Sequence, residues 1–318
     1  RMEDIVPEGH LLRLVDQYID FGFIKDKVRH LYSHTGRPSI DPEILLRMLL
    51  IGYLYGITSE RRLCEEVKMH IGYRWFVGLS LEDKVPDHST FSKNRHERFS
   101  ENDVFQKIFD EIVQQCINKG LLTGKHLTVD STYIRANASF KSLEPIVVEM
   151  KPKEYIEKLK EENPVQDKPW EPGEDYPHRG KKISNDTYRS KTDPDARLSR
   201  KSFRATTDLY HSATYIMDNK SRIIVGSDIG RPDKKTDCEN ALVQLRRIKW
   251  TYKMKPESLG ADKGYAAGEF IHNLINEDIN PHSPIVDYRS QNERGIYPID
   301  KFSFDKARGI FICPDGKE

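Results

Sequence analysis

The sequence predicts an α+β protein in two parts: an all-helical domain over about residues 1–120, then a mixed sheet flanked by helices over residues 121–318. Apolar residues recur at helical spacing up to about residue 120. The periodicity changes at Lys125, where strand-like segments begin. Residues from about 141 to 202 are rich in Lys, Glu, Pro and Asp and poor in aliphatic side chains, which predicts a long loop-rich insertion after the first strand.

The helices of the first domain are predicted from apolar spacing and from capping residues. Apolar residues of the segment 10–21 fall on one helical face. Asp41 followed by Pro42 is an N-cap with proline in the first helical position, and it begins a largely apolar helix that runs to about Tyr55. Further helices are predicted after the N-caps Ser59 and Asp87, and over 102–118 up to the C-terminal cap Gly120.

The second domain alternates strands with helices. The predicted elements are a strand over 126–132, the insertion, strands over 206–217 and 222–228 joined by a turn, a helix over 237–250, a strand over 258–262, a helix over 268–275 and a strand over 280–286. A hairpin followed by alternating helix and strand gives a mixed sheet covered by helices. Ribonuclease H-like domains have this order of elements.

Composition argues against a membrane protein and against a zinc knuckle, and it leaves DNA binding open. The chain carries 51 Lys and Arg against 50 Asp and Glu, so the net charge gives no support to DNA binding, although local patches matter more than the sum. The sequence has no run of 18 apolar residues and no signal peptide at its start, which predicts a cytoplasmic protein with no membrane contact. The four cysteines are too far apart in sequence for a zinc knuckle.

Two aspartates sit in the same local setting. Asp130 ends the first predicted strand, and Asp262 ends a later one. Groups at the carboxyl ends of neighbouring strands can converge on one site, and paired Mg²⁺ ions need shared carboxylate ligands. The alternative interpretation is a turn or helix cap, because aspartate is common after strands.

Several segments resemble the motifs of one protein family. They are residues 128–132 (TVDST) with 136–138 (ANA), residues 261–265 (ADKGY), residues 86–92 (PDHSTFS), residues 192–196 (TDPDA) with Arg200 and Lys201, and residues 311–316 (FICPDG). Together, and in this order, they resemble bacterial insertion-sequence DDE transposases, in particular the 1182-like group. The resemblance covers nearly the whole chain.

This resemblance implies a transposase that cleaves DNA 3′ ends and transfers strands with two Mg²⁺ or Mn²⁺ ions. Asp130 would bind both ions and Asp262 one. A third ligand is implied, a Glu on a helix on the order of a hundred residues or more beyond the second Asp, whereas 56 residues follow Asp262 here. We assign neither Glu269 nor Glu318 to that role. We therefore expect the chain to be a C-terminally truncated piece that is inactive alone.

DNA is the partner that the resemblance implies, both as transposon ends and as target. It also implies a homodimer or higher assembly on that DNA, associated with the bacterial nucleoid. The candidate phosphate-binding residues are Lys93, Arg95, Arg98, Arg61, Arg62 and Lys263. The alternative is a solvated helix surface on which Glu97 and Glu65 balance these charges.

Two other functions remain open. The chain could be a DNA-binding regulator of transposition without catalytic activity, or a hydrolytic nuclease of the same fold. Among other residues, we interpret His211 as a half-buried strand residue, with a hydrogen bond near the site as the alternative. We interpret Asp237 as a helix N-cap, with support of the metal site as the alternative. Tyr73, Trp75 and Phe76 are predicted to fill the core or a domain interface.

Overall fold

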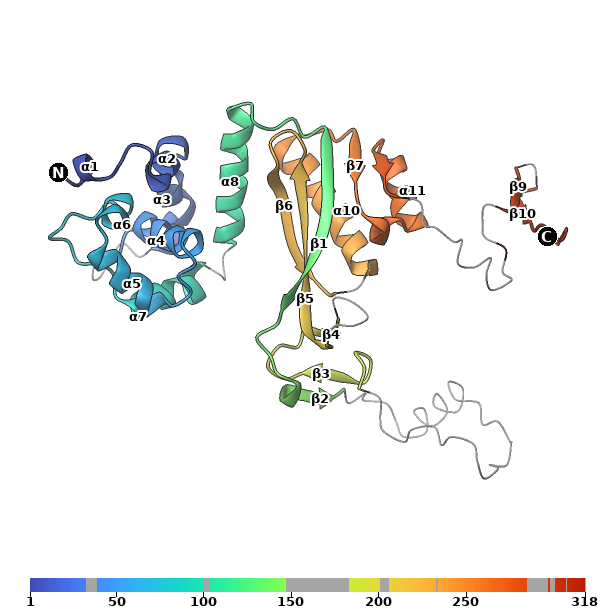
Figure 1. The fold of residues 1–318 in the computed structure, drawn as a ribbon, viewed down its shortest axis with the longest axis horizontal. Helices are drawn as coiled ribbons and strands as arrows, with labels where there is room; N and C mark the ends of the chain where they lie inside the picture. Colours follow the sequence, from blue (N-terminus) through green and yellow to red (C-terminus); the bar gives the residue numbers. More distant parts are fainter. Residues whose placement is uncertain are drawn as a thin grey trace, which may run out of the picture. The chain divides into compact units, whose positions relative to one another are not determined.

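The computed structural model describes residues 1–32, 39–99, 103–146, 183–200, 206–232, 234–284, 297, 301–306 and 308–317. These residues form two compact units, Arg1–Thr123 and Gly124–Glu318 (Figure 1). Among them, no helix combines the length and the hydropathy needed to cross a membrane.

The first unit is helical, as the sequence predicts. Its elements are α1 (Met2–Ile5), α2 (Leu11–Tyr18), α3 (Phe23–Val28), η1 (Arg29–Leu31), α4 (Pro42–Leu54), α5 (Glu60–Met69), α6 (Ile71–Phe76), α7 (His88–Lys93), the π-helical segment η2 (Asn94–Phe99) and α8 (Val104–Asn118). The short helices α1, α3 and α6 are not predicted, because segments of four to six residues hold too few turns to show a period.

Predicted N-caps in this unit are confirmed. The carboxylate of Asp41 accepts the amide of Glu43, Ser59 Oγ accepts the amide of Arg62, and Asp87 accepts that of Ser89. Each bond satisfies an amide that the first helical turn leaves without a partner. The helix after Asp87 changes at Asn94 from α- to π-helical geometry, so the basic helix expected there is not one continuous α-helix.

The core of the helical unit centres on α4. Leu45, Met48 and Ile51 are fully or almost fully buried there, and Phe76 of α6 packs in the same cluster. Tyr73 and Phe76 thus fill the core, as predicted, and half-buried Trp75 packs against it.

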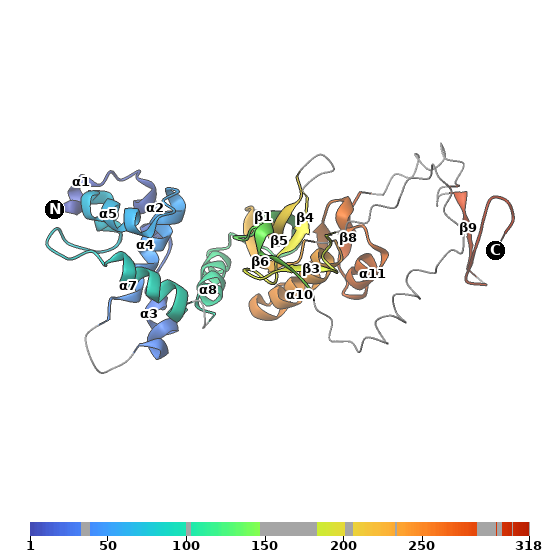
Figure 2. The ribbon, with the colours of Figure 1, turned by 90° about the horizontal axis from the view of Figure 1, so that it is seen from below.

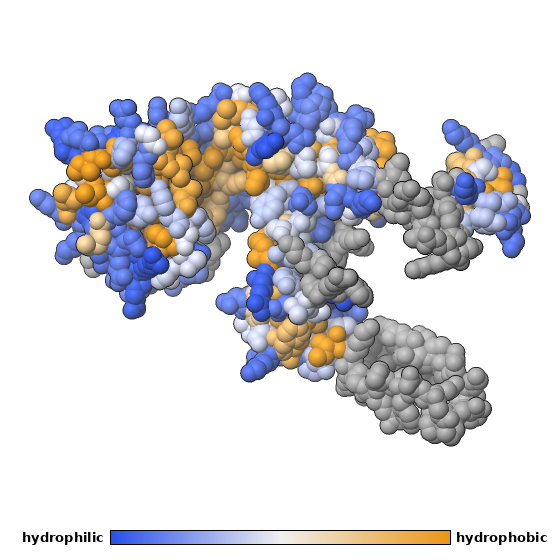
Figure 3. All heavy atoms as spheres, in the orientation of Figure 1, coloured by the Kyte–Doolittle hydropathy of each residue, from blue (hydrophilic) through white to orange (hydrophobic). Residues whose placement is uncertain are grey.

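Helix α2 carries apolar residues on its exposed side as well as on its buried side. It buries Leu12, while Leu11, Leu14 and Tyr18 are exposed. Figure 3 shows hydrophobic patches among hydrophilic residues on the face of the helical unit that it presents.

The second unit contains a mixed sheet. Its central strand β1 (His126–Arg135) pairs antiparallel with β5 (Asp208–Asp218) and parallel with β7 (Ser258–Gly260). Beyond β5 lies antiparallel β6 (Ile223–Gly230), and beyond β7 lies parallel β8 (Asn280–His282). Helix α10 (Lys234–Tyr252) connects β6 to β7, and α11 (Gly268–Asn276) connects β7 to β8. Among β1, β5, β6, β7 and β8, helices thus follow the third strand, β6, and the fourth, β7. This order of strands and helices is the ribonuclease H-like arrangement.

The two faces of the sheet differ. Leu127 and Val129 of β1 point to the face that α10 covers and are buried, whereas Asp130 and Thr132 are exposed. Helix α10 packs on β5 and β6, and its Gln244 donates to the carbonyl of Thr214. Figures 1 and 2 show α10 and α11 beside the sheet. Strand alternation therefore puts the β1 aspartate on the face opposite α10.

The ends of the predicted insertion are more ordered than expected. Residues 143–145 and 188–190 form the antiparallel pair β2 (Leu143–Pro145) and β3 (Tyr188–Ser190), and β4 (Arg197–Ser199) pairs with β5. Ala196 is buried with Ala136 and Leu209. The prediction of a loop-rich insertion is wrong for these ends, because strand pairing orders them and Leu143 and Leu198 pack against the buried residues. Residues 147–182 and 201–202 lie outside the described residues.

Other boundaries also move. Helix α10 begins at Lys234, so Asp237 lies in its first turn and is not its N-cap. The remaining elements are η4 (Phe140–Ser142), η5 (Lys263–Tyr265) and the hairpin of β9 (Ser303–Asp305) with β10 (Ile310–Ile312).

A matched pair of substitutions tests the assignment of the two faces. Ile216 of β5 is 0% exposed under α10, and Ile229 of β6 is 62% exposed. Ile216→Ala should lower the free energy of unfolding by about 2–5 kcal/mol, because it leaves a cavity. Ile229→Ala should change it by less than about 0.5 kcal/mol. Urea denaturation of both variants measures the difference, and equal effects would contradict this packing.

Candidate functional site

Asp130 and Asp262 belong to neighbouring parallel strands. The parallel register of β1 and β7 aligns His126 with Ser258 and Thr128 with Gly260, and it ends there, two residues before each aspartate. Asp130 lies within β1, which continues to Arg135 and does not end at the aspartate as predicted, whereas Asp262 follows the end of β7. On its other side, β7 pairs with β8, and there the hydrogen bonding extends one residue further, because the amide of Ala261 donates to the carbonyl of His282 at 3.0 Å.

Local hydrogen bonds hold one oxygen of each carboxylate. Asp130 Oδ1 accepts the amide of Ser131 at 2.8 Å, and Asp262 Oδ1 accepts the amide of Gly264 at 2.7 Å. Both side chains are exposed. A Cβ on residue 264 would lie 2.9 Å from Asp262 Oδ1, so any other residue there would displace this carboxylate. Within the described residues, the second oxygen of each carboxylate has no hydrogen-bond partner.

The carboxylates of Asp130 and Asp262 match the chemistry of a magnesium or manganese site, because these cations prefer hard oxygen ligands. Cys238, at the start of α10, does not add a soft ligand: burial, followed by the nearby carboxylates of Asp237 and Glu239, raises the pKa of its thiol to about 11. No group of three or more His, Cys, Asp or Glu suited to a metal occurs in the part of the chain that the structure describes. Glu269 is exposed on α11, and Glu318 lies outside that part.

The sequence analysis does not predict the hydroxyl cluster on the covered face of the sheet. Ser131 Oγ lies 3.0 Å from Thr214 Oγ1 and is hydrogen-bonded to the hydroxyl of Tyr265. Ser131 and Tyr265 both lie in the motifs quoted above, next to Asp130 and three residues after Asp262. Their position in those motifs was the available signal, but only the tertiary structure brings the two hydroxyls into contact.

The basic residues predicted to bind DNA fall into different environments. Lys93 and Lys263 are exposed, and no described carboxylate pairs with either. On α5, exposed Arg62 pairs with Glu66 at 3.3 Å, and Arg61 Nη2 lies 3.4 Å from His88 Nε2.

Arg95 is half-buried rather than displayed on a helix surface. Its guanidinium pairs with Glu60 at 3.0 Å, and it lines a pocket of about 260 Å³ between α4, α5 and α7. The side chain of Arg98 lies outside the described residues. Of the predicted basic residues, Lys93, Arg61, Arg62 and Lys263 are thus exposed, whereas Arg95 is held in an ion pair.

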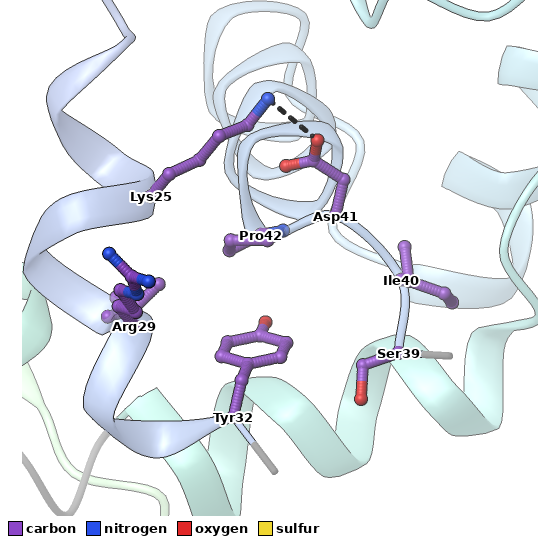
Figure 4. A pocket seen from close by; sticks show the side chains of 8 residues that line it. Lys25, Arg29, Tyr32, Ser39, Ile40, Asp41 and Pro42 are labelled. Atoms are coloured by element: carbon purple, nitrogen blue, oxygen red, sulfur yellow. Dashed lines mark ion pairs between the residues drawn. The ribbon is translucent and has the colours of Figure 1, made fainter. Parts of the chain in front are cut away.

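A second pocket, of about 350 Å³, lies between α3 and the start of α4 (Figure 4). Lys25 Nζ contacts Asp41 Oδ2 across it at 2.9 Å, and Tyr32 lies at its opposite side. Asp41 also caps α4, so this ion pair joins two helices, and we assign the pocket a structural role.

His211 is a half-buried strand residue, as predicted, and it has a carboxylate partner. Its Nε2 lies 2.9 Å from Asp193 Oδ2, in the loop between β3 and β4. The hydrogen bond from His211 holds the pKa of the Asp193 carboxyl below its usual range. Asp237 accepts a hydrogen bond from Ser212 Oγ at 2.6 Å, so it ties α10 to β5.

Most of the first unit matches a known protein family. Residues 1–97 match the family described as "Transposase domain (DUF772)". This match covers the helices from α1 to α7. The chain matches no curated protein.

Among solved structures, the chain is similar to three of the Mos1 transposase. It shares 11% identity and a TM-score of 0.24 with the Mos1 strand transfer complex, covering 82% of this chain and 62% of that one. It shares 10% identity and a TM-score of 0.23 with the Mos1 paired-end complex with left transposon end, covering 82% of this chain and 63% of that one. With the Mos1 mariner paired-end complex with Mn it shares 11% identity and a TM-score of 0.24, covering 83% of this chain and 67% of that one. The chain thus spans less than two thirds of the first two, and the fold assignment rests on the strand order above.

The Asp193–His211 pair generates a prediction about pH. A carboxyl whose pKa is lowered in the folded state contributes stability above its unfolded pKa of about 3.9, and this contribution is lost as the pH falls through the folded value. Asp193→Asn should therefore lower the free energy of unfolding by about 1 kcal/mol at pH 6–7 and by less below about pH 3. Asp195→Asn, in the same loop and exposed, is the control. Urea denaturation at several pH values measures both, and a pH-independent loss would contradict the pairing.

Proposed function

We propose that this chain carries the helical domain and ribonuclease H-like catalytic sheet of a DDE-type transposase, which cleaves DNA 3′ ends and transfers strands with divalent metal. One observation carries the proposal. β1 and β7 are parallel neighbours in a ribonuclease H-like sheet, and exposed Asp130 and Asp262 each follow the last paired residue of their segment by two positions. The match of residues 1–97 to a transposase domain selects this function among those of the fold.

In this proposal Asp130 and Asp262 hold Mg²⁺ or Mn²⁺, two ions when the site is complete. Asp130, on the central strand, would hold both ions, and Asp262 would hold one. The metal supplies activation of the attacking water or 3′ hydroxyl and stabilisation of the leaving 3′ oxygen. The chain's own contribution is to orient the two carboxylates, through the amides of Ser131 and Gly264.

The third carboxylate is proposed to come from outside the described residues. Glu269 points to solvent on α11 and is not assigned to the site. Without a third oxygen ligand, one metal would be held weakly. The partners are transposon-end and target DNA, with exposed Lys93, Arg61, Arg62 and Lys263 as candidate phosphate contacts. Assembly as a homodimer or larger on DNA belongs to the same proposal.

Substitution of the aspartates tests the chemistry. Asp130→Asn keeps the shape of the side chain and removes the charge that holds the metal. In the complete transposase, it should reduce cleavage of labelled transposon-end DNA in Mg²⁺ on the order of a thousandfold, because metal stabilisation amounts to several kcal/mol. Asp262→Asn should behave alike. DNA binding in a gel-shift assay should change little, since it depends on phosphate contacts elsewhere.

Two controls sharpen this experiment. Asp228 on β6 is exposed, and its Oδ1 accepts the next amide at 2.8 Å, as in Asp130, but it pairs with Thr214 on the opposite face of the sheet. Asp228→Asn and Glu269→Gln should cleave nearly as well as the wild type. Normal cleavage by Asp130→Asn would rule out the mechanism. Cleavage without strand joining by the wild type would favour a hydrolytic nuclease, and DNA binding without either reaction would favour a regulator.

A further inference from the structure

Three hydrogen-bonded hydroxyl groups lie on the face of the sheet that α10 covers, close in sequence to Asp130 and Asp262. Ser131 follows Asp130 on β1, so its side chain points to the opposite face, toward α10. There, Ser131 Oγ lies 3.0 Å from Thr214 Oγ1 and is hydrogen-bonded to the Tyr265 hydroxyl. Thr214 is 0% exposed and Tyr265 is 3% exposed. These three hydroxyl groups form a buried cluster that spans β1, β5 and the segment after β7.

Tyr265 is closely tied to Asp262. Both lie in one tight turn, in which Asp262 Oδ1 accepts the amide of Gly264 and its carbonyl accepts the amide of Tyr265 at 3.2 Å. The Tyr265 ring packs against Phe270 of α11, with ring centroids 5.6 Å apart. A shift of Tyr265 would therefore shift the Asp262 carboxylate with it.

Backbone pairing does not reach this turn from β1. The β1–β7 register ends at Thr128 and Gly260, two residues before each aspartate. The position of Asp262 relative to Asp130 thus needs a further contact between the turn and β1. The bond from Tyr265 to Ser131 supplies one, at the residue adjacent to Asp130.

We propose that Tyr265 is a positioning residue, whose hydroxyl holds the 262–266 turn against Ser131 and so fixes the spacing of the Asp130 and Asp262 carboxylates. Its relevance to metal binding rests on the proposed function. The hydroxyl touches neither carboxylate and acts through the backbone of the turn and of β1.

The environment of Tyr265 suits this role. Burial is the main cause that raises the pKa of its phenol well above the ordinary value. The group therefore stays protonated at physiological pH and keeps its hydrogen for the serine or threonine oxygen. Removing only this oxygen, in Tyr265→Phe, retains the ring and its contact with Phe270.

The test compares Tyr265→Phe, Ser131→Ala and the double variant in the full 318-residue chain. Ser131→Ala removes the same bond from the other side, so the pair stays informative if one variant folds poorly. Without metal, amide hydrogen exchange at residues 262–266 should be about threefold to tenfold faster in each single variant, as expected for one hydrogen bond. Ser131→Ala also removes the bond to Thr214, so the double variant should be about as fast as Ser131→Ala and slower than the product of the two single effects, because both substitutions remove the Tyr265–Ser131 bond.

Metal binding is the readout that a purely structural role would not change. Mn²⁺ titration followed by electron paramagnetic resonance should show about tenfold weaker binding in Tyr265→Phe, the size of effect found for groups that orient metal ligands. Ser190→Ala is the control, since Ser190 is equally buried in the same unit and bonded to Ser142 at 2.8 Å, but lies in β3. It should change neither measurement.

The outcomes separate this inference from the function on which it rests. Unchanged exchange at 262–266 in Tyr265→Phe would overturn the positioning role, and so would faster exchange with wild-type Mn²⁺ affinity. A wild-type chain that binds no Mn²⁺, or an Asp130→Asn variant that binds it equally well, would instead overturn the proposed metal site. In that case the exchange data alone decide whether Tyr265 holds the turn.

Discussion

The arrangement of the second unit depends on the pairing of β1, which is antiparallel to β5 on one side and parallel to β7 on the other. A parallel neighbour requires a crossover connection, and α10 is part of that crossover. The same helix buries the Leu127 and Val129 face of β1. Because side chains alternate along a strand, burial of that face leaves Asp130 exposed on the other. One pairing thus provides both the hydrophobic core and the position of the proposed site.

The start of β1 is fixed by a buried charge. Asp218, at the end of β5, is 0% exposed, and its carboxylate accepts the amides of Gly124 and Lys220 at 2.7 and 2.9 Å. A buried carboxylate is tolerated only when such donors satisfy it. Gly124 has φ of +65°, and a Cβ there would lie 2.6 Å from Met254 Cγ, so glycine is required where the second unit begins. This contact fixes the chain two residues before β1, and so helps to set where the strand that carries Asp130 starts.

The two units contribute different parts of the proposed function. The helical unit carries the transposase-domain match and exposed basic residues, whereas the sheet carries the carboxylates and the hydroxyl cluster around Tyr265. Within the helical unit, several charged groups are already used in holding the fold: Arg74 is buried and donates to the carbonyls of Ser80 and Asp83, and Arg95 pairs with Glu60. Such residues are poor candidates for phosphate contacts, because a partner already neutralises or buries them.

The sequence by itself determined the helical first unit, its N-caps at Asp41, Ser59 and Asp87, and the order of strands and helices that follows, because each depends on local periodicity and local hydrogen bonds. It also singled out Asp130 and Asp262, through resemblance more than spacing. Only the tertiary structure decided which strands are neighbours, and therefore that these aspartates belong to neighbouring segments. It alone showed the Tyr265–Ser131 contact, the order in residues 183–200 and the burial of Arg95. Those features depend on contacts between residues up to 134 positions apart, which no local pattern records.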